Sequence, residues 1–128
     1  MRLYSVAIAS LAIRAPLKWT DNLLSQHAVP GVVAARRGIA LRISRTGLLH
    51  LAIARELHVQ LGLGVRDALA LAIEFLAQDA GTPIARGSLL LQCDRAALVR
   101  TLDLRLRDAL ESAPNPRRGR PPRPTLPQ

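Results

Sequence analysis

The residues of this sequence whose type and spacing indicate a chemical role are its arginines, which can bind anions. Seventeen of the 18 basic residues are arginine, and nine acidic residues oppose them, which leaves a net charge of +9. Residues 1–66 carry nine positive and two negative side chains, residues 67–113 carry five and seven, and residues 114–128 carry four positive ones. Guanidinium groups bind phosphate, so two separated basic regions indicate two places that meet a polyanion.

Aromatic side chains are scarce, which narrows the choice of polyanion. Tyr4, Trp19 and Phe75 are the three aromatic residues of the chain. Proteins that bind single-stranded nucleic acid stack its bases on aromatic rings. Double-stranded DNA is therefore the expected partner.

The residues that most often perform catalysis or bind metals form no recognisable group. His27, His50 and His58 are the histidines, and His50 and His58 stand about 80° apart around one predicted helix and two turns apart along it. The single cysteine, Cys93, can form neither an internal disulfide nor a cysteine metal cluster. We expect histidines at the surface or at helix ends, an inert buried thiol, no enzyme activity, no metal and no cofactor.

Apolar spacing and capping residues predict five helices. Ser5, Ser44 and Asp94 are the predicted caps of three of them, and Gly62 is the predicted end of one. The helices are expected over residues 5–11, 17–27, 44–61, 65–78 and 94–112. The segment 65–78 is apolar nearly all round and is therefore expected at the centre of the core.

Two segments have the pattern of short strands. Val32-Val33 and the alternating run Ile39–Ile43 are joined by Arg36-Arg37-Gly38, which predicts a hairpin with a basic tip. The apolar run Ser88–Cys93 predicts a short buried strand.

Asp103 and Arg107, four residues apart on the last helix, are expected to form an exposed ion pair.

The order helix, turn, helix, basic hairpin, helix is that of a winged helix-turn-helix. The chain resembles the MerR-type family of DNA-binding proteins over about residues 1–77. The matching segments are Tyr4-Ser5-Val6, Leu11-Ala12-Ile13, Trp19, Arg36-Arg37-Gly38 and Leu61-Gly62-Leu63-Gly64. It departs from the family in having Ala12 at the turn position usually given to glycine, and in lacking the family's long dimerising coiled-coil helix.

The resemblance implies DNA contacts on the second helix and on the hairpin. Lys18, Thr20 and Asn22, together with Asp21, would lie near base edges or phosphates, and Arg36, Arg37 and Arg42 would lie on the wing. An asparagine amide can pair bidentately with adenine, so Asn22 is the candidate for a base contact. The alternative is that Asp21 and Asn22 are solvated helix residues.

The last segment of the chain has a different composition. Residues 114–125 contain no Leu, Ile, Val or aromatic residue, and we expect them to be disordered. Arg118-Gly119-Arg120-Pro121, flanked by Arg117 and Arg123, resembles an AT-hook, in which arginines extend along the narrow minor groove of A/T-rich DNA. The alternative is a solvating basic tail.

These patterns predict a mainly α fold: a winged helix-turn-helix with a small β-hairpin, then a helical segment, a short strand and a C-terminal helix. The expected organisation is a DNA-binding region over 1–79, a strand and helix for dimerisation or a partner over 80–113, and a basic tail over 114–128. The expected function is sequence-specific binding of double-stranded DNA by a homodimeric transcriptional regulator in the cytoplasm, on the nucleoid, with no membrane partner. The alternative is a protein-interaction module, antitoxin-like or accessory, that binds its partner through residues 67–113. A signal peptide is a competing interpretation of residues 1–16.

Overall fold

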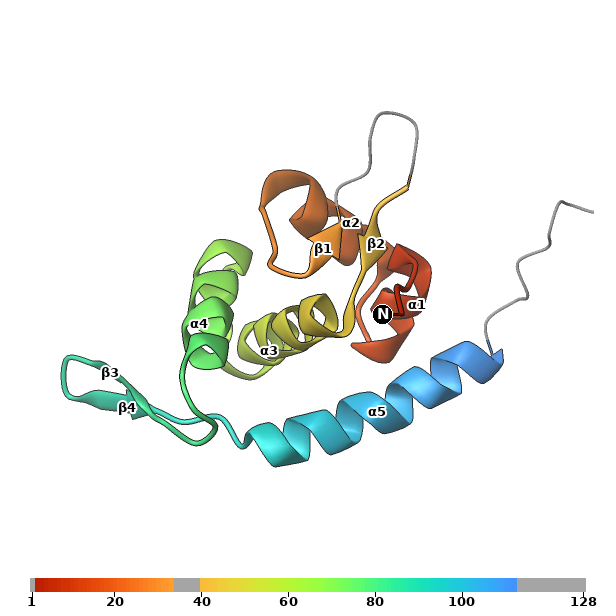
Figure 1. Cartoon of the computed structure of the whole chain (residues 1–128). Coiled ribbons are helices and arrows are strands. Elements are labelled where there is room, and N and C mark those ends of the chain that lie inside the picture. The colour runs from red at the N-terminus through yellow and green to blue at the C-terminus, as the bar shows by residue number, and fades with distance from the viewer. Residues whose placement is uncertain (1, 34–39, 113–128) are drawn as a thin grey trace, which may run out of the picture.

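A computed structural model describes residues 2–33 and 40–112. These residues form a mainly helical fold with two small antiparallel hairpins (Figure 1). None of the described helices has both the length and the apolar character needed to cross a bilayer. The elements in chain order are α1 (Val6–Ala12), α2 (Leu17–Gln26), β1 (Val32–Val33), β2 (Arg42–Ile43), α3 (Arg45–Leu61), α4 (Val65–Ala77), β3 (Ile84–Arg86), β4 (Leu89–Leu91) and α5 (Arg95–Ser112).

The helix boundaries follow the capping residues of the sequence. The hydroxyl oxygen of Ser5 accepts a hydrogen bond from the Ile8 amide at 3.1 Å, and that of Ser44 accepts one from the Gly47 amide at 3.3 Å. Asp94 Oδ1 accepts from the Ala97 amide at 3.0 Å at the start of α5. Gly62 ends α3 in the left-handed conformation, with φ 71°. The side chains of Ser5, Ser44 and Asp94 thus accept hydrogen bonds from amide groups that have no partner within the first helical turn.

The turn between α1 and α2 differs from its expected form. Ala12 is the last residue of α1 and is buried, so it is not the turn residue. Arg14 instead adopts the left-handed conformation, with φ 55°, and among the described residues it is the one non-glycine residue with a positive φ. A side chain in this conformation clashes with its own backbone, at a cost of about 1–2 kcal/mol. The α1–α2 turn is therefore strained at Arg14.

Replacing Arg14 by glycine should stabilise the protein. We expect Arg14→Gly to raise the free energy of unfolding by about 0.5–1 kcal/mol, because the relieved strain exceeds the extra entropy that glycine has in the unfolded chain. Urea denaturation measures this difference. Arg14→Ala removes the same charge and keeps the strain, so it should give no such gain; an equal gain from both variants would mean that charge, and not backbone strain, is responsible.

The first hairpin joins the N-terminus to α3. Val32 pairs with Ile43 and Val33 with Arg42, while Tyr4 exchanges two backbone hydrogen bonds of 2.8 Å with Ile43. Leu41 and Ile43 turn inward and Arg42 is exposed, which confirms the predicted alternation over this part of the second strand. Residues 34–39, which include the predicted basic tip, lie outside the described residues.

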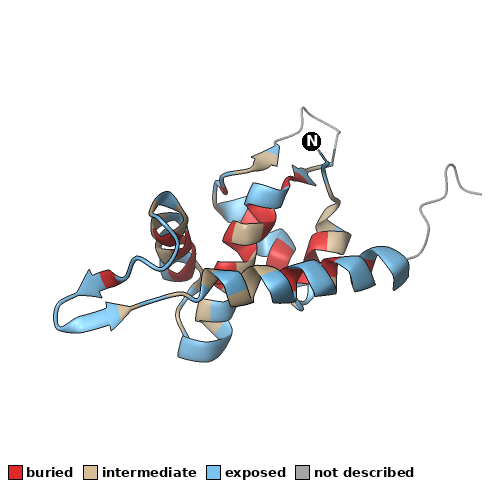
Figure 2. Ribbon diagram, turned by 60° about the horizontal axis from the view of Figure 1, so that its bottom comes forward, coloured by how far each residue is buried: buried red, intermediate tan, exposed pale blue. Residues whose placement is uncertain are grey.

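Helix α3, and not α4, occupies the centre of the core. Leu48, Leu51 and Ala54 of α3 are fully buried, and the helix lies between α2 and the first hairpin on one side and α5 on the other (Figures 1 and 2). Helix α4 packs along α3 through Ala68, Leu69, Ala72 and Phe75, but its Ile73 is exposed. The prediction that residues 65–78 are central was wrong, because the all-round apolarity of α4 comes partly from alanines that face outward.

The segment Ser88–Cys93 was wrongly predicted to be a buried strand. Its central part is β4, which pairs with β3 in a hairpin that projects from the helical body (Figure 2). Leu89 and Leu90 are 67% and 72% exposed. Strand β3 was not expected, because the turn residues Gly81 to Pro83 precede it and its three residues are too short to show alternation.

Helix α5 crosses beneath α3 and α1 and completes the core (Figure 1). Its Leu102, Leu106 and Ala109 are buried within the chain. Asp103 does not pair with Arg107: it binds the guanidinium of Arg45 on α3, with Nη1 and Oδ1 2.6 Å apart. Both side chains are about half-exposed, so this pair contributes about 0–1 kcal/mol.

Candidate nucleic-acid interface

Helix α2 has one face in the core and one in solvent. Thr20, Leu23 and Leu24 are buried, whereas Lys18 and Asn22 are exposed. The side-chain amide of Asn22 makes no hydrogen bond with any described residue, so both its donor and its acceptor are available. An exposed, unsatisfied amide and an ammonium group on one helix can meet base edges and phosphates.

Thr20 cannot belong to this surface. Its side chain is completely buried, and its hydroxyl oxygen has no hydrogen-bond partner among the described residues. The neighbouring Asp21 is exposed instead. The expected contact of Thr20 with DNA was therefore wrong, and Asp21 places one negative charge on the outer face.

Trp19 fixes the outer face of α2 relative to α3. The guanidinium carbon of Arg55 lies 4.9 Å from the centre of the indole, and the His58 ring centre lies 5.6 Å from it. A cation over an aromatic face contributes about 0.5–1 kcal/mol when exposed and more when desolvated. Trp19 is thus a packing residue that holds α2 in place.

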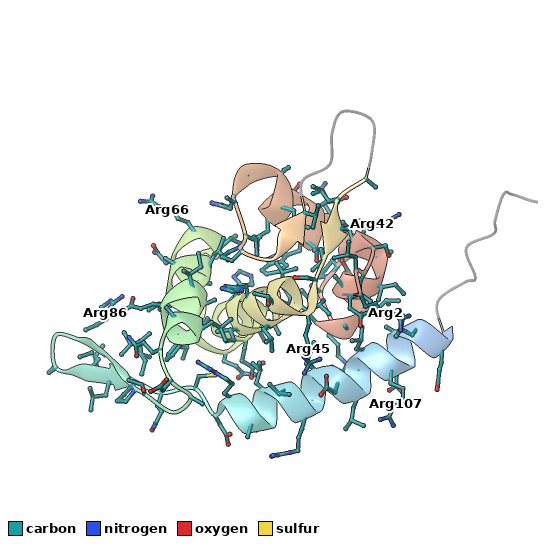
Figure 3. The ribbon with its side chains drawn as sticks, in the orientation of Figure 1. Arg2, Arg42, Arg45, Arg66, Arg86 and Arg107 are labelled. Carbon is teal, nitrogen blue, oxygen red and sulfur yellow. The ribbon has the colours of Figure 1, made fainter. Side chains whose placement is uncertain are left out.

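Basic side chains from two further elements lie on either side of α2 in the view of Figure 3. In Figure 3, Arg42 points outward beside the first hairpin and Arg66 points outward from the start of α4, with α2 between them. We call Lys18, Asn22, Arg42 and Arg66 the α2 edge. None of its three basic side chains has a carboxylate partner among the described residues, whereas Arg45 binds Asp103 and Arg86 binds Glu74. These three charges are available to an external anion.

Arg66 was not among the residues expected to contact DNA. The clue in the sequence was its place as the second residue of the helix predicted after Gly64. The Cα–Cβ bonds of a helix tilt toward its N-terminus, so a side chain in the first turn can extend beyond the end of the helix. The predicted contacts Arg36 and Arg37 of the wing, and Arg117, Arg118, Gly119, Arg120 and Pro121 of the tail, lie outside the described residues.

Two of the three histidines, His50 and His58, have structural hydrogen bonds. His50 was expected near the surface but is buried, and its Nδ1–H donates to the Thr46 carbonyl oxygen at 2.8 Å. His58 Nδ1–H donates to the Leu63 carbonyl oxygen at 2.7 Å just beyond the end of α3, as expected for a helix-end histidine. Over residues 2–33 and 40–112 no three His, Cys, Asp or Glu side chains come together as a metal site.

Cys93 lies just beyond β4 and is partly buried. Burial raises the pKa of its thiol above the usual value, and the neighbouring Arg95 only partly opposes this. A thiol with a raised pKa forms little of the reactive thiolate at neutral pH.

Comparisons of the chain with protein-family models, with curated proteins and with solved structures found no match. The fold and the α2 edge are those of a mainly helical protein with a basic surface that is open to an anionic partner.

Proposed function

We propose that the chain is a winged helix-turn-helix protein that binds double-stranded DNA in a sequence-specific manner and regulates transcription. The observation that carries this proposal is the α2 edge: Lys18 and Asn22 are exposed on α2, and α2 lies between Arg42 and Arg66 in the view of Figure 3. An α-helix fits the major groove of B-DNA, where each base pair presents a distinct pattern of donors and acceptors. The resemblance of residues 1–77 to MerR-type proteins supports the same assignment.

The parts of the α2 edge would have different tasks. Lys18, Arg42 and Arg66 would neutralise phosphates, which fixes the register of the protein on the duplex without reading its sequence. Asn22 would read a base edge. Arg36 and Arg37, a few residues before Arg42 in the sequence, would add phosphate contacts from the wing.

Asn22→Ala tests the base contact. The variant should lose about 1–3 kcal/mol of binding free energy on the preferred sequence and little on unrelated duplexes, since one bidentate base contact contributes this much discrimination. The preferred sequence is first selected from a random duplex pool, and both affinities are then measured by fluorescence anisotropy.

Gln26→Ala, an exposed change at the end of the same helix, is the matched control and should change neither affinity. An equal loss on preferred and unrelated duplexes would instead assign Asn22 to the DNA backbone or to folding.

The tail is proposed as a second, minor-groove contact through Arg118-Gly119-Arg120-Pro121. Tethering a weak contact to the folded domain raises its effective concentration. Deleting 114–128 should weaken binding mainly on duplexes with an A/T run beside the main site, where the groove is narrow. Arg118→Lys with Arg120→Lys keeps the charge and should lose the A/T preference. Equal affinity of parent and lysine variant on A/T-flanked and G/C-flanked duplexes would defeat this proposal.

A second candidate function is protein interaction through residues 67–113, and one observation favours it. Leu89 and Leu90 expose most of their surface on the projecting β3–β4 hairpin, where a partner or a second copy of the chain could cover them. One edge of β4 pairs with β3, and Leu102, Leu106 and Ala109 of α5 are buried within the chain. The proposed homodimer would therefore use the exposed leucines of this half: Leu89 and Leu90 on the hairpin, and Leu104 and Leu110 on α5. Failure of the chain to bind duplex DNA at low salt would favour this function over the first.

A further inference from the structure

A partly open cavity of about 490 Å³ lies between α3, the end of β4 and α5. Its walls are mostly apolar, with Leu57 from α3, Leu91 from β4, and Leu98 and Leu102 from α5. Sites for small ligands have volumes of about 300–1,000 Å³ and combine apolar walls with a few polar groups. The cavity therefore has the size and the lining of a small-molecule site, and it is separate from the outer face of α2.

Two arginines supply the positive charges of this cavity. Arg55 lines it from α3 and Arg105 lines it from α5. Neither has a carboxylate partner within 4.0 Å among the described residues, and Arg55 Nε is buried without a hydrogen-bond acceptor there. A guanidinium group without a carboxylate partner can bind an anionic oxygen through charge-assisted hydrogen bonds.

Two acidic residues, Glu56 and Asp94, also line the cavity, so its four charged side chains sum to zero. Asp94 lines it, but its carboxylate accepts the Ala97 amide and caps α5. Glu56 also lines it and is exposed to solvent, where its charge is screened. Neither carboxylate lies within 4.0 Å of a guanidinium nitrogen of Arg55 or Arg105, so both arginines can bind the carboxylate of a ligand with an apolar body.

We propose that this cavity is a binding site for a small hydrophobic carboxylic acid, with its carbon chain among the leucines and its carboxylate on Arg55 and Arg105. Because Arg55 also stacks on Trp19, the ligand would act on α2. Only the expected effect of the ligand on DNA binding rests on the proposed function. The binding itself is independent of DNA and is tested in its absence.

Trp19 is the single tryptophan, so its fluorescence reports events at Arg55 directly. Octanoate and 1-octanol have the same chain length and differ in charge, and each is titrated into the full chain. Octanoate should give a saturable change and bind at least about tenfold more tightly than 1-octanol, since hydrogen bonds to charged groups are the stronger ones. Equal affinities, or no binding of octanoate at millimolar concentration, would overturn the proposal.

Substitutions locate the site. Arg55→Gln and Arg105→Gln should each weaken octanoate binding about tenfold and leave 1-octanol binding unchanged. Arg107→Gln, on a side chain of α5 that points away from the body in Figure 3, removes the same charge outside the cavity and should have no effect. Ala97→Phe narrows the cavity and should weaken the binding of both ligands.

Calorimetry repeats each titration, because Arg55→Gln also changes the surroundings of Trp19. Thermal melts show whether each variant folds, and Arg105→Gln tests the proposal without touching the indole contact. A loss with Arg107→Gln as large as that with Arg105→Gln would show nonspecific attraction to a basic protein and overturn the assignment.

Discussion

Gly31→Ala is expected to destabilise the protein by about 3–5 kcal/mol, which is a large effect for the addition of one methyl group. Gly31 has φ 87°, and a Cβ atom there would overlap the backbone nitrogen of Gly47 and lie 2.7 Å from Ser44 Oγ. Its carbonyl oxygen also accepts the Ser44 hydroxyl at 2.7 Å and the Ser44 amide at 2.9 Å. The first hairpin is thus attached to the start of α3 by a contact with no room for a side chain.

Gly81→Ala is the matched control. Gly81 has nearly the same φ, 86°, but a Cβ atom there would meet no heavy atom within 4 Å. Its substitution should therefore cost only the strain of the left-handed conformation, about 1–2 kcal/mol. Chemical denaturation of both variants gives the comparison, and equal losses would show that the close approach of Gly31 to Gly47 contributes nothing.

The largest expected effect on binding is that of Lys18→Ala, Arg42→Ala and Arg66→Ala combined. Each lost phosphate contact should reduce the slope of log K against log salt by about 0.9, so the triple variant should lose about 2.7 units of slope. At about 0.1 M salt this corresponds to a loss of affinity of roughly two to three orders of magnitude, uniform across sequences. All three side chains are exposed, so the fold should persist.

A second triple variant distinguishes direct phosphate contacts from the long-range attraction of DNA to a positively charged protein. Arg100→Ala, Arg105→Ala and Arg107→Ala remove three positive charges from α5, which lies across α3 from α2 (Figure 1). The slope should fall by less than about one unit, because these groups act on DNA only through screened, long-range attraction. Similar slopes for the two triple variants would remove the α2 edge from the interface.

The helices were predictable because their signals are local. Ser5, Ser44 and Asp94 accept amide hydrogen bonds three residues ahead, and Gly62 ends α3, so each boundary depends on a few neighbouring residues. Apolar spacing likewise predicted the extent of α5. Such features need no knowledge of distant contacts.

The remaining features depend on contacts between residues far apart in the sequence. Asp103 has Arg107 within reach on its own helix but binds Arg45, 58 residues away, because α5 crosses α3 at that point. Leu89 and Leu90 are exposed because β4 pairs with β3 outside the body, and composition does not distinguish such a strand from a buried one. In α2, the burial of Thr20 follows from packing against the core and not from its polarity.

Equilibrium titration of the wild-type chain with duplex DNA over a range of salt concentrations tests the central proposal most directly. Phosphate contacts by Lys18, Arg36, Arg37, Arg42 and Arg66 predict that log K falls with log salt with a slope of about −4.5, or steeper if the tail also binds. Absence of binding at low salt, or an affinity that does not change with salt, would contradict the assignment of the α2 edge to DNA.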